Sequence, residues 1–215
     1  MKIKYPRTPH LPWSPGITDD DKVMHDVSSF IGQQVVVTVK MDGENTTLGH
    51  GYVHARSLDY APHPSRSWIK SMHAQIDHHI PEGWRICGEN LFASHSIRYG
   101  HLPDFFLVFS IWDEGNESLS WEETVRWAGA LGLATVPVIY EGPWDTNLIK
   151  GLHRPIFNGD VCEGYVVRVA DRFRHEDFSR RVAKYVRADH VQTDDHWLHG
   201  PMIRNRLSSD AMGRG

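Results

Sequence analysis

The stretch VVVTVKMDGEN, residues 35–45, is a run of valines that ends in an amine and a carboxylate. β-branched residues suit a packed, pleated surface, so we expect a buried strand over 35–40. Alternation along this strand places Lys40 and Asp42 on one face, with Gly43 in a turn. A lysine partly removed from water loses some preference for its charged form, which favours a nucleophilic amine. The alternative is a lysine that reaches solvent beside an ordinary Asp-Gly turn.

Composition limits the class of protein. The chain has 215 residues, 40% of them hydrophobic and 23% charged, which is enough for one sizeable globular domain. A net charge of −4 argues against a surface that is basic all over, but not against a local basic groove. Two cysteines make no disulfide framework, and we see neither a signal peptide nor a membrane-length apolar run. We therefore expect a soluble, cytoplasmic protein, and a monomer, although the sequence leaves the oligomeric state open.

The pattern along the chain predicts an α+β domain with mainly antiparallel sheets flanked by helices. Ser120 with Glu123 forms a capping box for one helix, and the proline in LATVPVIYEG predicts an edge strand. Residues 1–16 resemble an extended arm. The expected helices cover 19–30 (capped by Thr18), 65–80, 121–132 and 145–152, and the expected strands cover 35–40, 46–55 (as a hairpin), 83–92, 104–114, 133–142, 162–171 and 180–190.

Five further short motifs follow KMDG in order along the chain. They are ARS (55–57), CGENLF (87–92), FLVFSIWDE (106–114), EGYVVRV (163–169) and VAKYV (182–186). Each is weak alone, but six ordered matches between Lys40 and Lys184 form a strong joint signal. Together they resemble the motifs of the covalent nucleotidyltransferases, the superfamily of ATP-dependent ligases and mRNA capping enzymes. The GEN that follows KMD and the FSIWD strand look more similar to the RNA ligase branch than to the DNA ligase branch.

The resemblance implies an ATP-grasp-like nucleotidyltransferase domain of the ligase and capping-enzyme type. It implies that a lysine attacks the α-phosphate of ATP and becomes a lysine–AMP phosphoramidate, with Mg²⁺ or Mn²⁺ bound at the phosphates. The roles that it implies are Lys40 as nucleophile, Asp42 and Glu163 as catalytic, metal-binding carboxylates, Lys184 on the α-phosphate, Arg56 and Glu89 on the ribose or a nearby phosphate, and Phe109 stacked on the base.

Some of these roles have simpler alternatives. Glu89 could be a loop carboxylate, and Phe109 could be plain core. Alternation groups Phe109 with Leu107 and Ile111, but periodicity does not decide which face of the strand meets a nucleotide.

The chain also departs from the family pattern. Val39 stands where many relatives have a glutamate, and Val182 stands where the last motif often has a second lysine, so that Arg181 or Arg187 might substitute. Only 31 residues follow Lys184 (215 minus 184), so we expect a single domain over 1–215 with a short extension over 190–215 and no separate OB-type or helical domain.

Three functions are compatible with these motifs. The first is an ATP-dependent RNA ligase that joins an RNA 5′-phosphate to a 3′-hydroxyl, possibly in a nicked duplex. The second is another polynucleotide nucleotidyltransferase, either a DNA nick-sealing ligase or a capping guanylyltransferase. The third is a degenerate module that only binds nucleotide or RNA. Seven basic residues lie between 168 and 187 against three acids, either as a phosphate-tracking patch or as a solvated hairpin.

Overall fold

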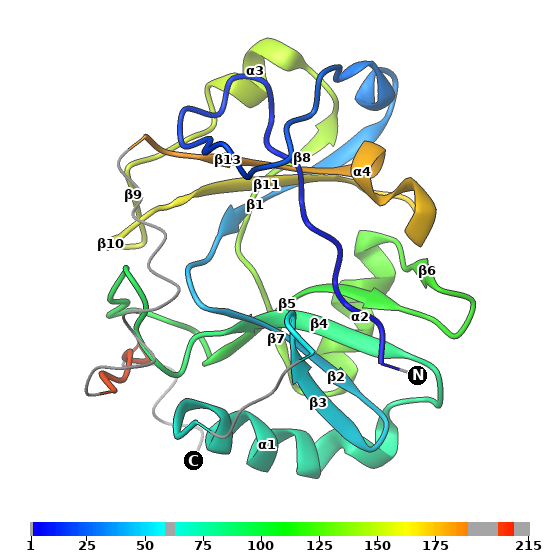
Figure 1. Cartoon of the computed structure of the whole chain (residues 1–215), viewed down its shortest axis with the longest axis vertical. Coiled ribbons are helices and arrows are strands. Elements are labelled where there is room, and N and C mark those ends of the chain that lie inside the picture. Colours follow the sequence, from blue (N-terminus) through cyan, green and yellow to red (C-terminus); the bar gives the residue numbers. More distant parts are fainter. Residues whose placement is uncertain (1, 59–62, 189–201, 209–215) are drawn as a thin grey trace.

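The computed structural model describes residues 2–58, 63–188 and 202–208. It confirms the α+β class, with two main sheets that are antiparallel except for one pairing. Figure 1 shows the smaller sheet above the larger one, with the N-terminal segment running from one to the other. Among the described residues, no helix combines the length and the apolar character that a membrane crossing requires.

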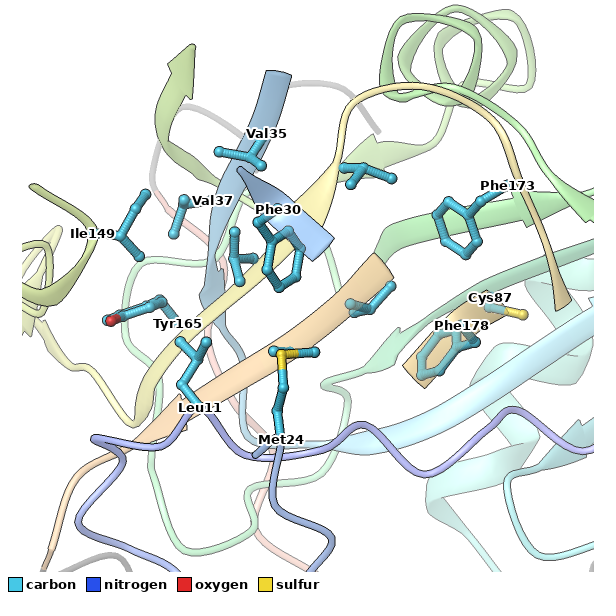
Figure 2. Close-up of a cluster of buried hydrophobic side chains, with 14 of the residues drawn as sticks. Leu11, Met24, Phe30, Val35, Val37, Cys87, Ile149, Tyr165, Phe173 and Phe178 are labelled. Carbon is cyan, nitrogen blue, oxygen red and sulfur yellow. The ribbon is translucent and has the colours of Figure 1, made fainter. Parts of the chain in front are cut away.

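The smaller sheet is built around the valine-rich strand of the opening stretch. All six of its residues from Val35 to Lys40 pair with β11, and Lys40 lies opposite Gly164. Figure 2 draws fourteen side chains of the buried cluster that joins this sheet to its neighbours, where Leu11 from the N-terminal segment lies beside Tyr165. The sheet order is β13 (Val182–Val186), β11 (Gly164–Val169), β1 (Gln34–Lys40) and β8 (Val138–Pro143).

The larger sheet carries helices on one face and the cleft on the other. Ile69 of α1 and Ala128 of α2 pack with Leu48, Phe106 and Val108 of the sheet in one buried cluster. The sheet order is β12 (Phe173–Arg174), β6 (Glu117–Ser118), β5 (Phe106–Trp112), β4 (Arg85–Asn90), β2 (Glu44–Gly49) and β3 (Tyr52–Ala55), and β7 (Ala134–Thr135) pairs in parallel with β5.

Most predicted helices are confirmed. The capping box of Ser120 and Glu123 starts α2 as expected, and Gly132 with a φ of +71° follows its end. The helices are α1 (Ser65–Ile76), α2 (Trp121–Ala130), α3 (Thr146–Lys150) and α4 (Phe178–Arg181), with 3₁₀ turns at Ser28–Phe30, Asp77–His79 and His175–Asp177 and a small hairpin of β9 (Ile156–Phe157) and β10 (Asp160–Val161).

Two predicted elements are wrong. The helix over 19–30 is absent except for the 3₁₀ turn at its end, because the backbone of residues 22–24 pairs with His10 in an extended conformation. The single strand over 133–142 is split at Pro137. β7 joins the larger sheet and β8 forms an edge of the smaller one, so this segment connects the two sheets.

Candidate active site

A cavity of about 540 Å³ lies between the two sheets and is closed on a third side by the N-terminal segment. Residues predicted from motifs far apart in the chain meet here, because β1 ends at this cavity and pairs with β11, which in turn pairs with β13. All seven predicted site residues line it: Lys40, Asp42, Arg56, Glu89, Phe109, Glu163 and Lys184.

The centre of the site is an ion pair between Lys40 and Glu163. The Lys40 Nζ lies 2.6 Å from both carboxylate oxygens of Glu163. The Glu163 side chain is 1% exposed and that of Lys40 is 24% exposed, so the amine is the partner that opens to the cleft. Strand pairing produces this contact, since Lys40 is opposite Gly164 and Glu163 directly precedes it.

The charge on Lys40 differs from the expectation. Burial by itself would lower the pKa of Lys40, but the carboxylates of Glu163 and Glu89 outweigh burial, and the pKa is raised. Without a nucleotide the amine is therefore protonated rather than neutral. The sequence pattern indicated desolvation correctly but could not show that two acidic side chains converge on the same nitrogen.

Glu89 lies on β4 beside this pair. One of its carboxylate oxygens accepts a hydrogen bond from the Gly43 N–H at 3.1 Å. Burial raises the pKa of Glu89 to about 8, with Lys40 opposing and Glu163 adding to the shift. Gly43 must be glycine here, since a Cβ would lie 2.6 Å from the carbonyl oxygen of Asn90. The KMDG turn thus depends on a close approach between the backbones of Gly43 and Asn90.

Asp42 organises a loop at the edge of the cleft. Its Oδ2 accepts hydrogen bonds from the Ser96 hydroxyl and from the Ile97 N–H, each at 2.7 Å. Its backbone N–H donates to the Tyr99 hydroxyl at 2.9 Å. These contacts position the 94–99 loop, and the metal-binding role that the resemblance implies for Asp42 stays a prediction.

Residues 202–208 form hydrogen bonds with the same 94–99 loop. The Asn205 side chain is 1% exposed and accepts a hydrogen bond from the Tyr99 N–H at 2.8 Å. Its amide nitrogen donates to the carbonyls of Leu91 and Ala93. Most of the predicted extension over 190–215 otherwise lies outside the described residues.

Phe109 lies on the same face of β5 as Leu107, as alternation predicts, and a β-bulge beside it changes the alternation that follows. Cys87 pairs with Ser110 and Gly88 pairs with Val108, so Phe109 is an extra residue in β5. Phe109 and Ser110 both line the cavity, whereas Ile111 packs on the helix side of the sheet. The simple alternation predicted from the sequence is therefore wrong beyond this point, since bulges redirect side chains next to functional sites.

The predicted cations differ in their surroundings. Lys184, on β13, lies with its Nζ 3.5 Å from Asp21 Oδ1. Arg56 follows β3 and is half-buried; its guanidinium makes no hydrogen bond or ion pair with another described residue. Arg66 of α1 forms a buried ion pair with Glu44 at the same cavity.

The proposed basic patch between 168 and 187 does not form one surface. Arg168 is buried, and burial lowers its pKa to about 10. Arg172 makes ion pairs with Asp113, Glu117 and Glu123 on the larger sheet and α2. Since Lys184 faces the cleft, the strand register divides these cations among separate environments.

Sequence reasoning missed the contribution of the N-terminal segment. Tyr5 packs edge-on against Phe109 with ring centroids 5.1 Å apart, and it lines the cavity. His10 is fully buried and lies 3.3 Å from Asp21. No motif marked these residues, because isolated aromatic and histidine residues in an irregular segment carry no periodic signal.

Comparisons with known proteins agree with this geometry. A family model described as RNA ligase matches residues 33–186, while no curated protein matches the sequence. An archaeal ATP-dependent RNA ligase is 17% identical with a TM-score of 0.54, and the match covers 86% of this chain and 48% of that one. Naegleria gruberi RNA ligase with PPi is 17% identical with a TM-score of 0.57, covering 91% and 64%.

A variant of the Naegleria gruberi enzyme with ATP and Mn is 18% identical with a TM-score of 0.51, covering 75% of this chain and 52% of that one. At these identities the structures show a shared fold. The chain spans about half the length of the archaeal ligase that it matches.

Proposed function

Because the chain belongs to the RNA ligase family, we propose that it is an ATP-dependent RNA ligase that forms a covalent lysine–AMP intermediate on Lys40. The observation that carries this proposal is the position of the Lys40 amine. It lies inside a cavity large enough for a nucleotide and 2.6 Å from the buried carboxylate of Glu163. A lysine with a purely structural role would not need to open toward that cavity.

In the first step, the Lys40 Nζ attacks the α-phosphorus of ATP. A nitrogen–phosphorus bond forms, the bond between the α-phosphorus and the bridging oxygen breaks, and pyrophosphate leaves. The nitrogen must first pass its ammonium proton to water in the cleft, to which the side chain is 24% exposed. Any group that draws Glu163 away from Lys40 leaves burial as the main influence and lowers the pKa of the amine. A divalent cation bound to Glu163 would have this effect.

The other cleft residues suit the parts of a nucleotide. The Phe109 ring lines the cavity and can offer a face for the base, and the Arg56 guanidinium can meet ribose or phosphate oxygens. The Lys184 ammonium can offset charge at the α-phosphate, which is usually a large part of catalysis at phosphorus. Glu89 lies between the KMDG turn and the amine, where it can accept from a ribose hydroxyl.

The site fits a divalent cation that brings its own ligands. The described residues contain no group of three or more His, Cys, Asp or Glu side chains placed to hold a metal. Glu163 is the carboxylate that could bind Mg²⁺ or Mn²⁺, and Asp42 could add a second oxygen despite its contacts with the loop. When bound, such a cation would offset the charge of the triphosphate.

Two further steps complete the proposed reaction. An oxygen of an RNA 5′-phosphate attacks the phosphorus of lysine–AMP, the nitrogen–phosphorus bond breaks, and Lys40 regains its amine. A 3′-hydroxyl oxygen then attacks the 5′-phosphorus, AMP leaves, and a phosphodiester forms. RNA with a 5′-phosphate and a 3′-hydroxyl, either single-stranded or in a nicked duplex, is the proposed substrate.

Intact mass spectrometry tests the first step. After incubation with ATP and Mg²⁺, the wild-type chain should gain the mass of one AMP, and Lys40→Ala should gain none. Lys4→Ala, which removes an exposed lysine, is the matched control and should behave as wild type. An unmodified wild-type chain, also with Mn²⁺, would contradict the proposal.

Substrate competition separates the alternatives. Labelled GTP beside ATP distinguishes a guanylyltransferase from an adenylyltransferase. Nicked duplexes with RNA or DNA on the 3′-hydroxyl side distinguish an RNA ligase from a DNA nick-sealing enzyme. Nucleotide binding without any covalent transfer would favour a degenerate binding module.

A further inference from the structure

The N-terminal segment places the Asp21 carboxylate next to the Lys184 ammonium, and the His10 imidazole next to Asp21. The Lys184 Nζ is 3.5 Å from Asp21 Oδ1, and the Nε2 of His10 is 3.3 Å from Asp21 Oδ2. The Lys184 and Asp21 side chains are 13% and 11% exposed, and His10 is fully buried. The contact between Lys184 and Asp21 joins residues 163 positions apart in the chain.

Backbone pairing fixes this arrangement. The Lys184 N–H donates to the Pro9 carbonyl at 2.9 Å, and the Leu11 N–H donates to the Lys184 carbonyl at 2.8 Å. Residues 9–11 thus extend the smaller sheet beside β13. On the other side, His10 exchanges backbone hydrogen bonds with Lys22 and Met24, which brings Asp21 to the edge of the cleft.

Side-chain contacts then fix the orientation of the Asp21 carboxylate. Its Oδ2 accepts from the Thr18 N–H at 3.1 Å and from the Thr18 hydroxyl at 2.8 Å. Oδ1 is directed to Lys184. Thr18, the expected helix cap, therefore closes a turn with Asp21, whose carboxylate lines the cleft.

Lys184 needs such a partner because its surroundings oppose a positive charge. The charged and titratable groups near it are Lys40 on β1, Glu163 before β11, and His10 and Asp21 from the N-terminal segment. Burial, followed by the like charge of Lys40, lowers the pKa of Lys184, whereas Asp21 raises it. His10 adds no positive charge near pH 7, since burial and Lys184 lower its pKa to about 4.

We propose that Asp21 is a positioning residue that holds Lys184 charged and directed into the cleft until a phosphate group takes its place as partner. This inference rests on the proposed lysine adenylylation at Lys40. The N-terminal segment is then part of the catalytic unit, and a phosphate that binds Lys184 must compete with an acid already held by Thr18.

The test compares Asp21→Asn with Asp19→Asn, which changes an exposed acid two residues away. Single-turnover adenylylation is measured from pH 6 to pH 10. We expect the alkaline limb of the Asp21→Asn profile to move down by about one pH unit, because an opposite charge within a few ångströms has that order of effect. Asp19→Asn should match wild type. In a Lys184→Arg background, adding Asp21→Asn should no longer move the alkaline limb, since a guanidinium stays charged.

A second measurement does not depend on catalysis. Acetic anhydride labelling against pH, read by peptide mass spectrometry, reports how readily each lysine loses its proton. Lys184 should label several-fold faster at pH 8 in Asp21→Asn than in wild type, while exposed Lys150 should be unchanged. Equal Lys184 labelling in both proteins would overturn the inference, as would superimposable pH profiles. If wild type gains no AMP, the proposed function fails, and the labelling result alone then decides whether Asp21 controls Lys184.

Discussion

Replacing Lys40 by methionine should destabilise the protein, in addition to stopping any chemistry. The substitution leaves the Glu163 carboxylate, 1% exposed, without the ammonium that lies 2.6 Å from both of its oxygens. Removing one partner of a buried pair costs about 3–5 kcal/mol, and the partial exposure of Lys40 favours the lower value of about 3 kcal/mol. For a domain of this size that corresponds to a fall of roughly 6–12 °C in Tm.

The stability lost in Lys40→Met should depend on pH. In Lys40→Met, the folded chain lacks the ammonium that opposes the rise in the pKa of Glu89, which burial raises to about 8 in the wild type. The folded state therefore binds more protons, and the stability of the variant rises as pH falls from 8 to 5.

The assay is urea unfolding followed by fluorescence at pH 5, 6.5 and 8, with Lys4→Met as the control at an exposed lysine. The double variant of Lys40→Met and Glu163→Gln should recover more than about 1 kcal/mol relative to additive losses, since the two side chains contact each other. A Lys40→Met protein as stable as wild type at pH 8, with no coupling to Glu163→Gln, would refute the buried ion pair.

Three other perturbations test the cleft and its supports. Phe109→Leu should raise the KM for ATP by about 5- to 100-fold, because stacking on a base contributes about 1–3 kcal/mol, and an unchanged KM would remove Phe109 from the base site. Gly164→Ala should unfold the domain or lower the free energy of unfolding in urea by more than about 3 kcal/mol, since a Cβ would lie 1.9 Å from the Tyr185 carbonyl oxygen. The control is Gly129→Ala in α2, which meets no atom within 4 Å and should be neutral or stabilising. Burial lowers the pKa of His10 to about 4, so the unfolded chain binds a proton at this residue before the folded chain does as pH falls. The free energy of unfolding should therefore drop by about 3 kcal/mol between pH 6.5 and 4. His10→Gln should reduce this dependence on pH in thermal melts.

Local signals predicted the regular elements well. The valine run of β1 and the capping box at Ser120 each act within a few residues, so pattern and propensity were sufficient to place them. The six motifs also single out residues that meet in space, since all seven line one cavity.

What the sequence did not reveal depends on contacts between distant segments. The extra residue Phe109 is recognised only from the register of β4 against β5. The stretch over 19–30 has local helix signals, but pairing of residues 22–24 with His10 overrides them, since tertiary contacts outweigh propensity. The charge of Lys40 likewise depends on Glu163 and Glu89, which no local pattern places beside it.

The Asn205 peptide sets a limit on how far the protein can be shortened for biophysical work. Trimming the chain at residue 188 would leave the carbonyls of Leu91 and Ala93 and the N–H of Tyr99 without the side chain that satisfies them. Each buried polar group left without a hydrogen-bond partner costs about 1–3 kcal/mol of stability. The loss would destabilise the 94–99 loop, which donates hydrogen bonds to Asp42. A compact version for crystallisation or NMR should therefore retain residues 202–208, and protease nicking near Ser96 should report whether that peptide has come away.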